Sequence, residues 1–241
     1  MSLEKIKIEN KPMEEGFIAV NKPKGITSFK VIYVLRKITG IKKIGHCGTL
    51  DPLASGVLVC AIGRSATRKI DEFKDQDKVY LAEIELGKES DTYDLEGEIR
   101  QNIITKKLKV SELKNVLKKY TGEFLQMPPV YSAKKIGGVR AYKLARKGDI
   151  VEMKKSKVTI KKIKIISYHF PFLKIEISCG KGTYIRSLAN DIGKDLGCGA
   201  VLCNLERTCV GKIRLKDSIP LDKINENNWE NFLLKNFLLK N

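Results

Sequence analysis

The chain has 241 residues, and 46 lysines and arginines against 28 aspartates and glutamates give it a formal net charge of +18 at pH 7. Its apolar run at residues 57–62 is far shorter than the ~20 residues of a membrane span, and its mixed-charge N-terminus lacks the apolar core of a signal peptide. We expect a cytoplasmic protein without membrane attachment. Its basic surface either favours binding of a polyanion or reflects a proteome that is rich in lysine throughout.

Turn and capping signals divide the first hundred residues, after an extension over residues 1–15, into short elements. They predict a strand at residues 16–25, a helix at 27–40 and a glycine-rich loop leading into a second strand at 45–63. A second helix at 64–77, a third strand at 78–87 and a polar loop at 90–99 follow. Thr27 or Ser28 is available as the cap of the first helix and Gly40 as its stop. The third strand alternates in period two, with Tyr80 on its apolar side.

The second half of the chain continues this mixture. Residues 110–124 predict an amphipathic helix capped by Ser111, whereas prolines in residues 127–148 exclude a helix at the start of a Lys-, Arg- and Tyr-containing loop. Within residues 155–197, two alternating strands lead into a helix. The repeat in residues 231–240, NFLLKNFLLK, predicts a short packing or oligomer-contact helix. We therefore expect an α+β (mixed α/β) fold, with a mostly antiparallel or mixed sheet flanked by helices and loops.

The cysteine, histidine and glycine patterns exclude several classes of site. Six cysteines occur without a Cys-x-x-Cys pair and there are only two histidines, so neither a metal site nor a disulfide framework is expected. Phosphate-binding glycine loops and a Gly-x-Ser-x-Gly nucleophile elbow are also absent from the sequence. ATP, NAD and serine-hydrolase chemistry are therefore unsupported.

One carboxylate has an unusual setting in the stretch GHCGTLDPLASGVLVCAIG. Asp51 follows Gly45 and Gly48, which let the backbone approach a ligand, and precedes Pro52, which fixes the turn. The buried strand that follows would anchor this loop at the edge of a cleft. The alternative is an Asx-turn, in which the aspartate caps its own loop.

A second candidate group occurs where a strand gives way to a helix, in GKGTYIRSLANDIG. Tyr184 and Arg186 lie at this junction. A guanidinium fork is a natural partner for a buried carboxylate that must stay oriented, although a solvated surface charge is the commoner role of arginine.

Several motifs occur together in a fixed order. They are NKPKGITSF, GHCGTLDPLASGVL, KVYLAEIELG with DTYDLEGE, MPPVYSAKKIGGVRAY, and GTYIRSLANDIG with LERTCVG. This set is similar to the TruB family of tRNA pseudouridine synthases over residues 16–224. Cys47, Thr49 and Glu206 depart from the residues common in that family: the first two are small enough to preserve the loop, and Glu206 replaces an arginine that could contact RNA.

The resemblance implies a pseudouridine synthase fold with the active-site cleft across the sheet. It implies isomerisation of uridine 55 in the T-loop of tRNA: the base flips out, the N1–C1′ bond breaks, the uracil rotates, and C5 joins C1′. No cofactor and no metal are required. Asp51 matches the catalytic aspartate, and a carboxylate can add to the sugar, add to the base, or abstract a sugar proton to give a glycal. The sequence leaves these three pathways open.

The same resemblance assigns supporting roles to further residues. It places four residues in the active site: Tyr80, which stacks on the uracil and can take the C5 proton, Tyr184, Arg186 as the partner of Asp51, and Leu205 as an apolar wall. RNA binding is expected of His46, Lys22, Lys134, Lys135 and Arg140. Lys22 could equally be structural, and each of the last three could be a solvated surface charge.

After residue 224 only a tail over residues 225–241 follows, too short for the RNA-binding PUA domain that many members carry. We therefore expect one catalytic domain over residues 16–224, acting as a monomer on the T-arm of tRNA without a guide RNA. An RNA chaperone that assists tRNA folding, alone or alongside catalysis, and a catalytic subunit guided by a separate RNA are the alternatives.

Overall fold

The computed structural model describes residues 14–102, 108–132, 134–145, 149 and 151–234. Within these residues a ten-stranded sheet runs in the order β14-β1-β3-β12-β4-β11-β10-β7, with β2 beside β3 and β13 beside β12. The strands are β1 (Gly16–Lys22), β2 (Ile44–His46), β3 (Ala54–Ile62), β4 (Lys78–Leu86), β7 (Gly122–Gln126), β10 (Ser156–His169), β11 (Phe172–Cys179), β12 (Ala200–Val210), β13 (Ile213–Arg214) and β14 (Ile219–Pro220).

Short helices and two small hairpins surround this sheet. The hairpins pair β5 (Lys88–Ser90) with β6 (Ile99–Gln101) and β8 (Lys135–Ile136) with β9 (Val139–Arg140). The helices are α1 (Ser28–Thr39), α2 (Gly63–Arg68), α3 (Ile70–Lys74), α4 (Val110–Lys119), α5 (Ala141–Ala145), α6 (Ile185–Asp195) and three single turns at Leu215–Asp217, Leu221–Lys223 and Trp229–Phe232. Among the described residues, no helix has the length and apolarity to cross a membrane.

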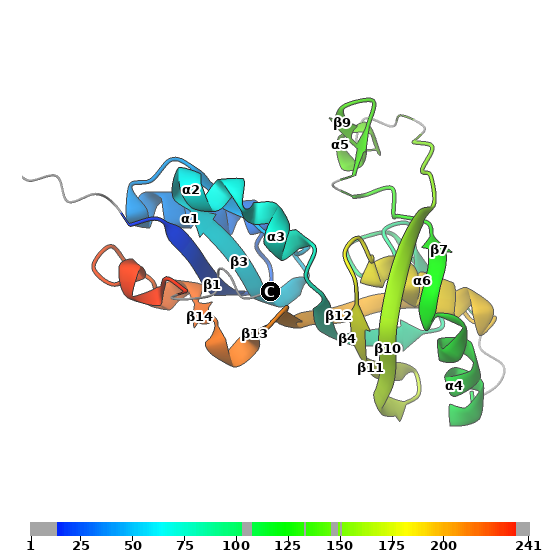
Figure 1. The fold of residues 1–241 in the computed structure, drawn as a ribbon. Coiled ribbons are helices and arrows are strands. Elements are labelled where there is room, and N and C mark those ends of the chain that lie inside the picture. Colours follow the sequence, from blue (N-terminus) through cyan, green and yellow to red (C-terminus); the bar gives the residue numbers. More distant parts are fainter. Residues whose placement is uncertain (1–13, 103–107, 133, 146–148, 150, 235–241) are drawn as a thin grey trace, which may run out of the picture.

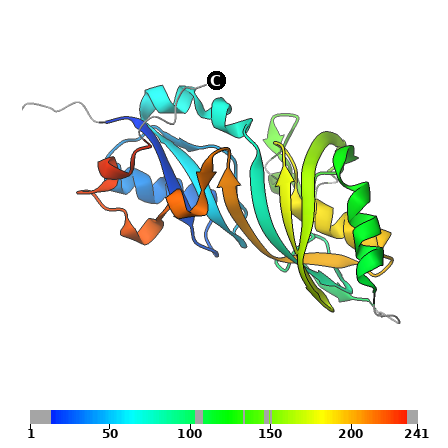
Figure 2. The same ribbon diagram turned by 60° about the horizontal axis from the view of Figure 1, so that its bottom comes forward.

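Strand directions confirm the expected mixed and mostly antiparallel sheet. Only the β1–β14 and β3–β12 pairs run parallel among the described strands. In Figure 1, β12 reaches from the half that contains β1, β3 and α1 to the half that contains β4, β10, β11 and α6, and Figure 2 shows the same arrangement after a turn. The long strand β12 therefore joins the two halves into one sheet.

The β1–β3 half is buried on both faces. Ile18 and Val20 of β1 belong to the main core, which α1 covers, while Phe17 packs against Phe73 of α3 on the other face with ring centroids 4.5 Å apart. Burial on both faces explains why β3 has a continuous apolar sequence, since a strand with only one buried face alternates. Strand β4 does alternate in burial, as the sequence predicts.

Local signals located some element ends and missed others. Helix α1 begins at the predicted cap, where Thr27 Oγ1 accepts from Lys30 N, and ends at Gly40 with φ +70°. The helix predicted over residues 110–124 is too long, because Gly122, with φ +105°, begins β7. Its N-cap is Lys109 and not Ser111, and the Glu112 carboxylate accepts from Lys109 N at 2.6 Å.

Other expectations need correction. The single helix predicted over residues 64–77 is two short helices separated at Lys69. Beyond the predicted domain boundary at residue 224, Trp229 is buried in the main core and Leu233 pairs with Ile18. The predicted terminal helix over residues 231–240 lies largely outside the described residues, and its described part ends as a bridge to β1.

Candidate active site

The loop between β2 and β3 holds Asp51 in a fixed position. Ser28, the first residue of α1, donates its hydroxyl to Leu50 O at 2.9 Å and accepts from Leu50 N at 2.8 Å. On the other side of the aspartate, Gly25 N donates to Pro52 O at 2.7 Å. The residues before and after Asp51 are therefore held by backbone and buried side-chain bonds, which orient the carboxylate.

The Asp51 carboxylate pairs with an arginine from the first turn of α6. Arg186 Nε lies 2.9 Å from Asp51 Oδ2, and the arginine side chain is 6% exposed whereas that of Asp51 is 35% exposed. The guanidinium also donates to Thr92 O and to Tyr131 O, at 3.0 and 3.1 Å. The pairing predicted for these two residues is thus present, and the carboxylate keeps a face open to a substrate.

A second carboxylate, which sequence analysis did not assign, holds the far side of this arginine. Asp94 Oδ2 lies 3.4 Å from Arg186 Nη1, and the Asp94 side chain is only 2% exposed. Its other oxygen, Oδ1, accepts from Thr92 Oγ1 at 2.6 Å and from Glu96 N at 3.0 Å. Asp94 is therefore a positioning residue, because it orients the guanidinium that in turn orients Asp51.

Tyr80 lies buried on β4, opposite Arg207 of β12. Burial raises the pKa of the Tyr80 phenol, while the charge of Arg207 and its hydrogen bond act in the opposite direction. The charge of Asp51 also acts to raise this pKa, with a smaller effect than burial. A phenol with a raised pKa is neutral at physiological pH and can donate a hydrogen bond.

Arg207 itself lies fully buried beneath the Asp51 loop. Its Nε donates to Val57 O at 2.7 Å and its Nη2 donates to Gly48 O at 3.1 Å. Gly56, with φ +102°, lets β3 lie close to β12, because a Cβ at that position would lie 2.3 Å from the backbone oxygen of Arg207. The guanidinium thus connects the loop of the catalytic candidate to the strand beside Tyr80. Its sequence context, LERTCVG, gave no signal beyond the resemblance itself.

Tyr184 and Leu205 complete the apolar surroundings. The Gln126 side chain holds the Tyr184 backbone at both ends, accepting from Tyr184 N at 2.9 Å and donating to Tyr184 O at 3.0 Å. Burial raises the pKa of the Tyr184 phenol, and the negative charge of Asp51 raises it further. Leu205 is buried on β12, where it pairs with Ala54, three residues after the aspartate.

The residues expected to bind RNA fall into different settings. Lys22 is fully buried, and its ammonium donates to Pro23 O at 2.9 Å and to Ile26 O at 2.7 Å. Burial lowers the pKa of Lys22 to about 8, although the charge of Asp51 acts in the opposite direction. A fully buried ammonium does not contact RNA directly, so the predicted RNA contact of Lys22 is wrong. Its burial and hydrogen bonds fit the alternative, a structural role beside the Asp51 loop.

The other basic candidates lie elsewhere. Lys134 Nζ donates to Ser156 Oγ and to Lys154 O, so this lysine anchors its loop to the start of β10. The side chains of Lys135 and Arg140 lie outside the described residues. His46 is half-buried at the end of β2, where it pairs with Cys60.

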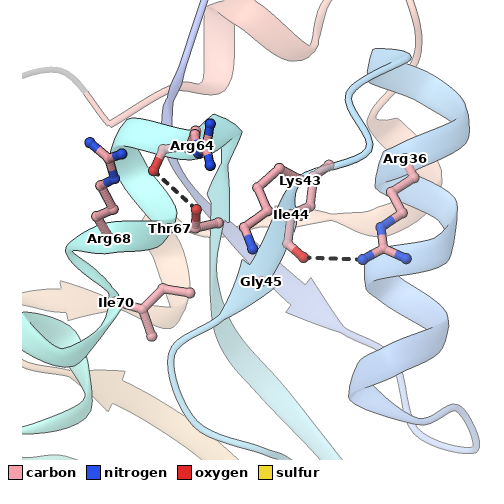
Figure 3. Close-up of a pocket in the computed structure, with 8 residues that line it drawn as sticks. All are labelled: Arg36, Lys43, Ile44, Gly45, Arg64, Thr67, Arg68 and Ile70. Carbon is pink, nitrogen blue, oxygen red and sulfur yellow. Dashed lines mark hydrogen bonds between the residues drawn. The ribbon is translucent and has the colours of Figure 1, made fainter.

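A basic pocket opens next to His46, on the surface of the β1–β3 half. It has a volume of about 400 Å³, and its lining residues are Arg36, Lys43, Ile44, Gly45, Arg64, Thr67, Arg68 and Ile70. Figure 3 shows Arg36 of α1 on one side of the pocket and Arg64 and Arg68 of α2 on the other. Four cations and no carboxylate line this pocket, which suits a phosphate group.

Within the described part of the chain, no three His, Cys, Asp or Glu side chains come close enough together to hold a metal ion. What the structure shows at Asp51 is a partly exposed carboxylate paired with the buried guanidinium of Arg186. A carboxylate in this setting can act as a nucleophile or stabilise positive charge at an anomeric carbon.

Comparison with known proteins identifies the family. Residues 36–185 match the TruB family pseudouridylate synthase (N terminal domain), and residues 186–240 match the tRNA pseudouridylate synthase B C-terminal domain. The chain is 44% identical to tRNA pseudouridine synthase B of Clostridium tetani, over 91% of this chain and 75% of the relative. It is 45% identical to tRNA pseudouridine synthase B of Protochlamydia amoebophila, over 92% of this chain and 84% of the relative.

Solved structures with the same fold include a chain in a Cbf5-Nop10-Gar1 complex. It matches with a TM-score of 0.68 and 27% identity, over 89% of this chain and 55% of the solved chain. A chain of an H/ACA RNP bound to a substrate RNA containing 2′-deoxyuridine matches with a TM-score of 0.66 and 25% identity, over 92% of this chain and 56% of the other. The present chain thus spans little more than half of these longer proteins.

Proposed function

The chain belongs to the TruB family of pseudouridylate synthases, and we propose that it isomerises uridine 55 in the T-loop of tRNA without a guide RNA. One observation carries this proposal: a partly open Asp51 carboxylate is held 2.9 Å from a buried guanidinium, which a second, buried carboxylate orients. Binding of RNA alone does not require this arrangement. It suits bond breaking at an anomeric carbon, where negative charge must be held in one position.

The reaction moves one glycosidic bond without any donor group. The N1–C1′ bond breaks, the uracil turns, C5 joins C1′, and the proton on C5 is lost while N1 gains one. Asp51 is the group that reaches the sugar or the base, and Tyr80 is a buried phenol on β4. The two tyrosines and Leu205 provide the apolar contacts that a flipped base needs in place of its stack.

This proposal can be tested by incubating the purified protein with an unmodified tRNA transcript. After incubation with no added RNA or protein, carbodiimide labelling and primer extension should give one new stop, one nucleotide to the 3′ side of uridine 55. Several stops, or a stop elsewhere, would contradict the position. A reaction that needs a second RNA would favour the guided alternative.

Arg207 gives a prediction about positioning within the site. Arg207→Lys should lower kcat by about tenfold to a hundredfold, because one ammonium cannot reach both Gly48 O and Val57 O as the guanidinium does, and a small displacement of a catalytic group is costly. The affinity for tRNA should change much less. Single-turnover kinetics and a binding titration measure the two effects separately.

The control for this prediction is Arg214→Lys on the neighbouring strand β13, where the arginine is exposed. It should behave as the unmodified protein. Equal losses of kcat and affinity in Arg207→Lys, accompanied by a much lower unfolding temperature, would show that Arg207 stabilises the fold without positioning the loop.

The basic pocket gives a prediction about RNA binding. Arg64→Ala with Arg68→Ala should weaken binding of tRNA and flatten the plot of log K against log salt by about 1.4 to 1.8, because each lost phosphate contact removes ~0.7–0.9 from the slope. Filter binding between 50 and 200 mM KCl, with Lys157→Ala on the exposed face of β10 as control, measures the slope. An unchanged slope would show that the pocket does not contact phosphates.

A further inference from the structure

The outer face of α1 carries two large aromatic side chains that the fold does not use. Phe29 is 63% exposed and Tyr33 is 44% exposed, whereas Val31, Ile32 and Leu35 on the inner face are buried in the core. Exposed aromatic side chains close together are typical of an interaction site. Both lie within the first two turns of the helix, on the face turned away from the sheet.

Cations accompany these rings. Lys30 Nζ and Lys37 Nζ lie 5.2 and 4.9 Å from the centroid of the Tyr33 ring, and the Arg36 guanidinium carbon lies 5.8 Å from that of Phe29. These are the separations of cation–π contacts. Helix α1 contains no acidic residue, so the face is positively charged as well as aromatic. We name Phe29, Lys30, Tyr33, Arg36 and Lys37 the α1 face.

The α1 face continues into two parts of the site already described. Arg36 donates to Ile44 O at 3.4 Å and lines the basic pocket, as Figure 3 shows. At the other end of the helix, Ser28 holds Leu50, the residue before Asp51. The helix that carries the α1 face therefore also lines the basic pocket and supports the loop of Asp51.

We propose that the α1 face binds RNA, with Phe29 and Tyr33 stacking on unpaired bases next to the target uridine while the neighbouring cations contact phosphates. The inference rests on the proposed function, because it takes tRNA as the ligand. Rings on a helix without acidic residues suit RNA better than a protein surface, since bases stack on aromatic rings and phosphates pair with cations. This contact lies outside the pocket of the flipped base.

The first test removes both rings. Phe29→Ala with Tyr33→Ala should raise the Kd for tRNA at least about fivefold for each lost stacked base, with the salt slope unchanged, because stacking releases no counterions. The loss should appear in KM more than in kcat. Phe29→Tyr with Tyr33→Phe keeps two rings and should restore the affinity. The matched control is Phe172→Ala, which removes a ring that is 45% exposed at the β10–β11 turn.

A spectroscopic measurement adds a readout that a structural role would not change. The chain has one tryptophan, Trp229, which is buried. In Tyr33→Trp, a new exposed indole should be quenched on addition of tRNA, while Trp229 alone gives the background signal of the parent protein. An unquenched indole at saturating tRNA would overturn the stacking contact.

The outcomes separate this inference from the function on which it rests. A parent protein that modifies tRNA, combined with a double alanine variant of unchanged Kd, would overturn the inference alone. A dimer of the parent protein that this variant dissociates would show a second copy on the α1 face, which also overturns it. A parent protein that neither binds nor modifies tRNA would overturn the proposed function.

Discussion

Replacing Asp51 with asparagine should lower the rate of pseudouridine formation by at least about 10⁴-fold, the order of loss seen when a central catalytic group is removed. The substitution keeps the size of the side chain and its place between Leu50 and Pro52, whose backbone bonds hold the loop. What it removes is the negative charge beside Arg186. Asparagine can neither attack an anomeric carbon nor stabilise positive charge there.

Binding of tRNA should survive this change. The Kd should remain within about threefold of the parent value, because one partly exposed carboxylate contributes little to the affinity for a polyanion. Asp71→Asn, at an exposed aspartate of α3, is the matched control and should retain full activity. Single-turnover rates and Kd values for the three proteins decide the point. Full turnover by Asp51→Asn would remove this residue from the mechanism.

The second large effect is expected at Arg186. Arg186→Ala should lower kcat by about 10³-fold, because Asp51 loses the group that orients it, and loss of one electrostatic partner in a catalytic site typically costs 10²–10³. The protein should also become less stable, since Asp94 would then be a buried carboxylate without a cation. Unfolding temperature and kcat must therefore be measured together.

Asp94→Asn separates orientation from stability. The asparagine oxygen can keep the hydrogen bonds from Thr92 and Glu96, because both reach the same oxygen, Oδ1. The amide nitrogen then faces the guanidinium, donor against donor, and the pair with Arg186 is lost. We expect kcat to fall about tenfold to a hundredfold with little change in KM. A double variant whose loss equals the product of the single losses would show that Asp94 and Arg186 act independently.

The sequence predicted those site residues whose surroundings lie close to them in the chain, and it missed those whose contacts come from distant segments. Asp51 was identified because its glycines, proline and following strand lie next to it in the sequence. The pairing with Arg186 came from the family resemblance, and the structure shows it at 2.9 Å. Asp94 was missed because its surroundings, SDTYDLEGEI, have the composition of an exposed turn. Its burial depends on segments far along the chain, Arg186 of α6 and Leu202 of β12, which pack against it.

In the fold, too, features that depend on neighbouring residues were predicted, and features that depend on distant segments were not. The caps of α1 and the alternation of β4 are local signals, and both were predicted. Strand β12 was not assigned, because it is central to the sheet through pairing with β3 and β4, which are distant in sequence. Arg207 could not be told from a surface charge for the same reason: its burial depends on Gly48 and Val57 of another segment. Gly122, where β7 begins after the end of α4 at Lys119, is a local signal that the sequence prediction overlooked in favour of the helical periodicity.

Release of tritium from C5 of uridine tests the central claim most directly, because C5 loses its hydrogen only when it becomes the glycosidic carbon. Purified protein alone would be incubated with a tRNA transcript labelled at C5 of its uridines, and with the same transcript carrying cytidine at position 55. We predict release equivalent to one uridine per molecule from the first transcript and none from the second. Release from both, or tight binding of the first without release, would contradict the assignment of this chain as a stand-alone synthase for uridine 55.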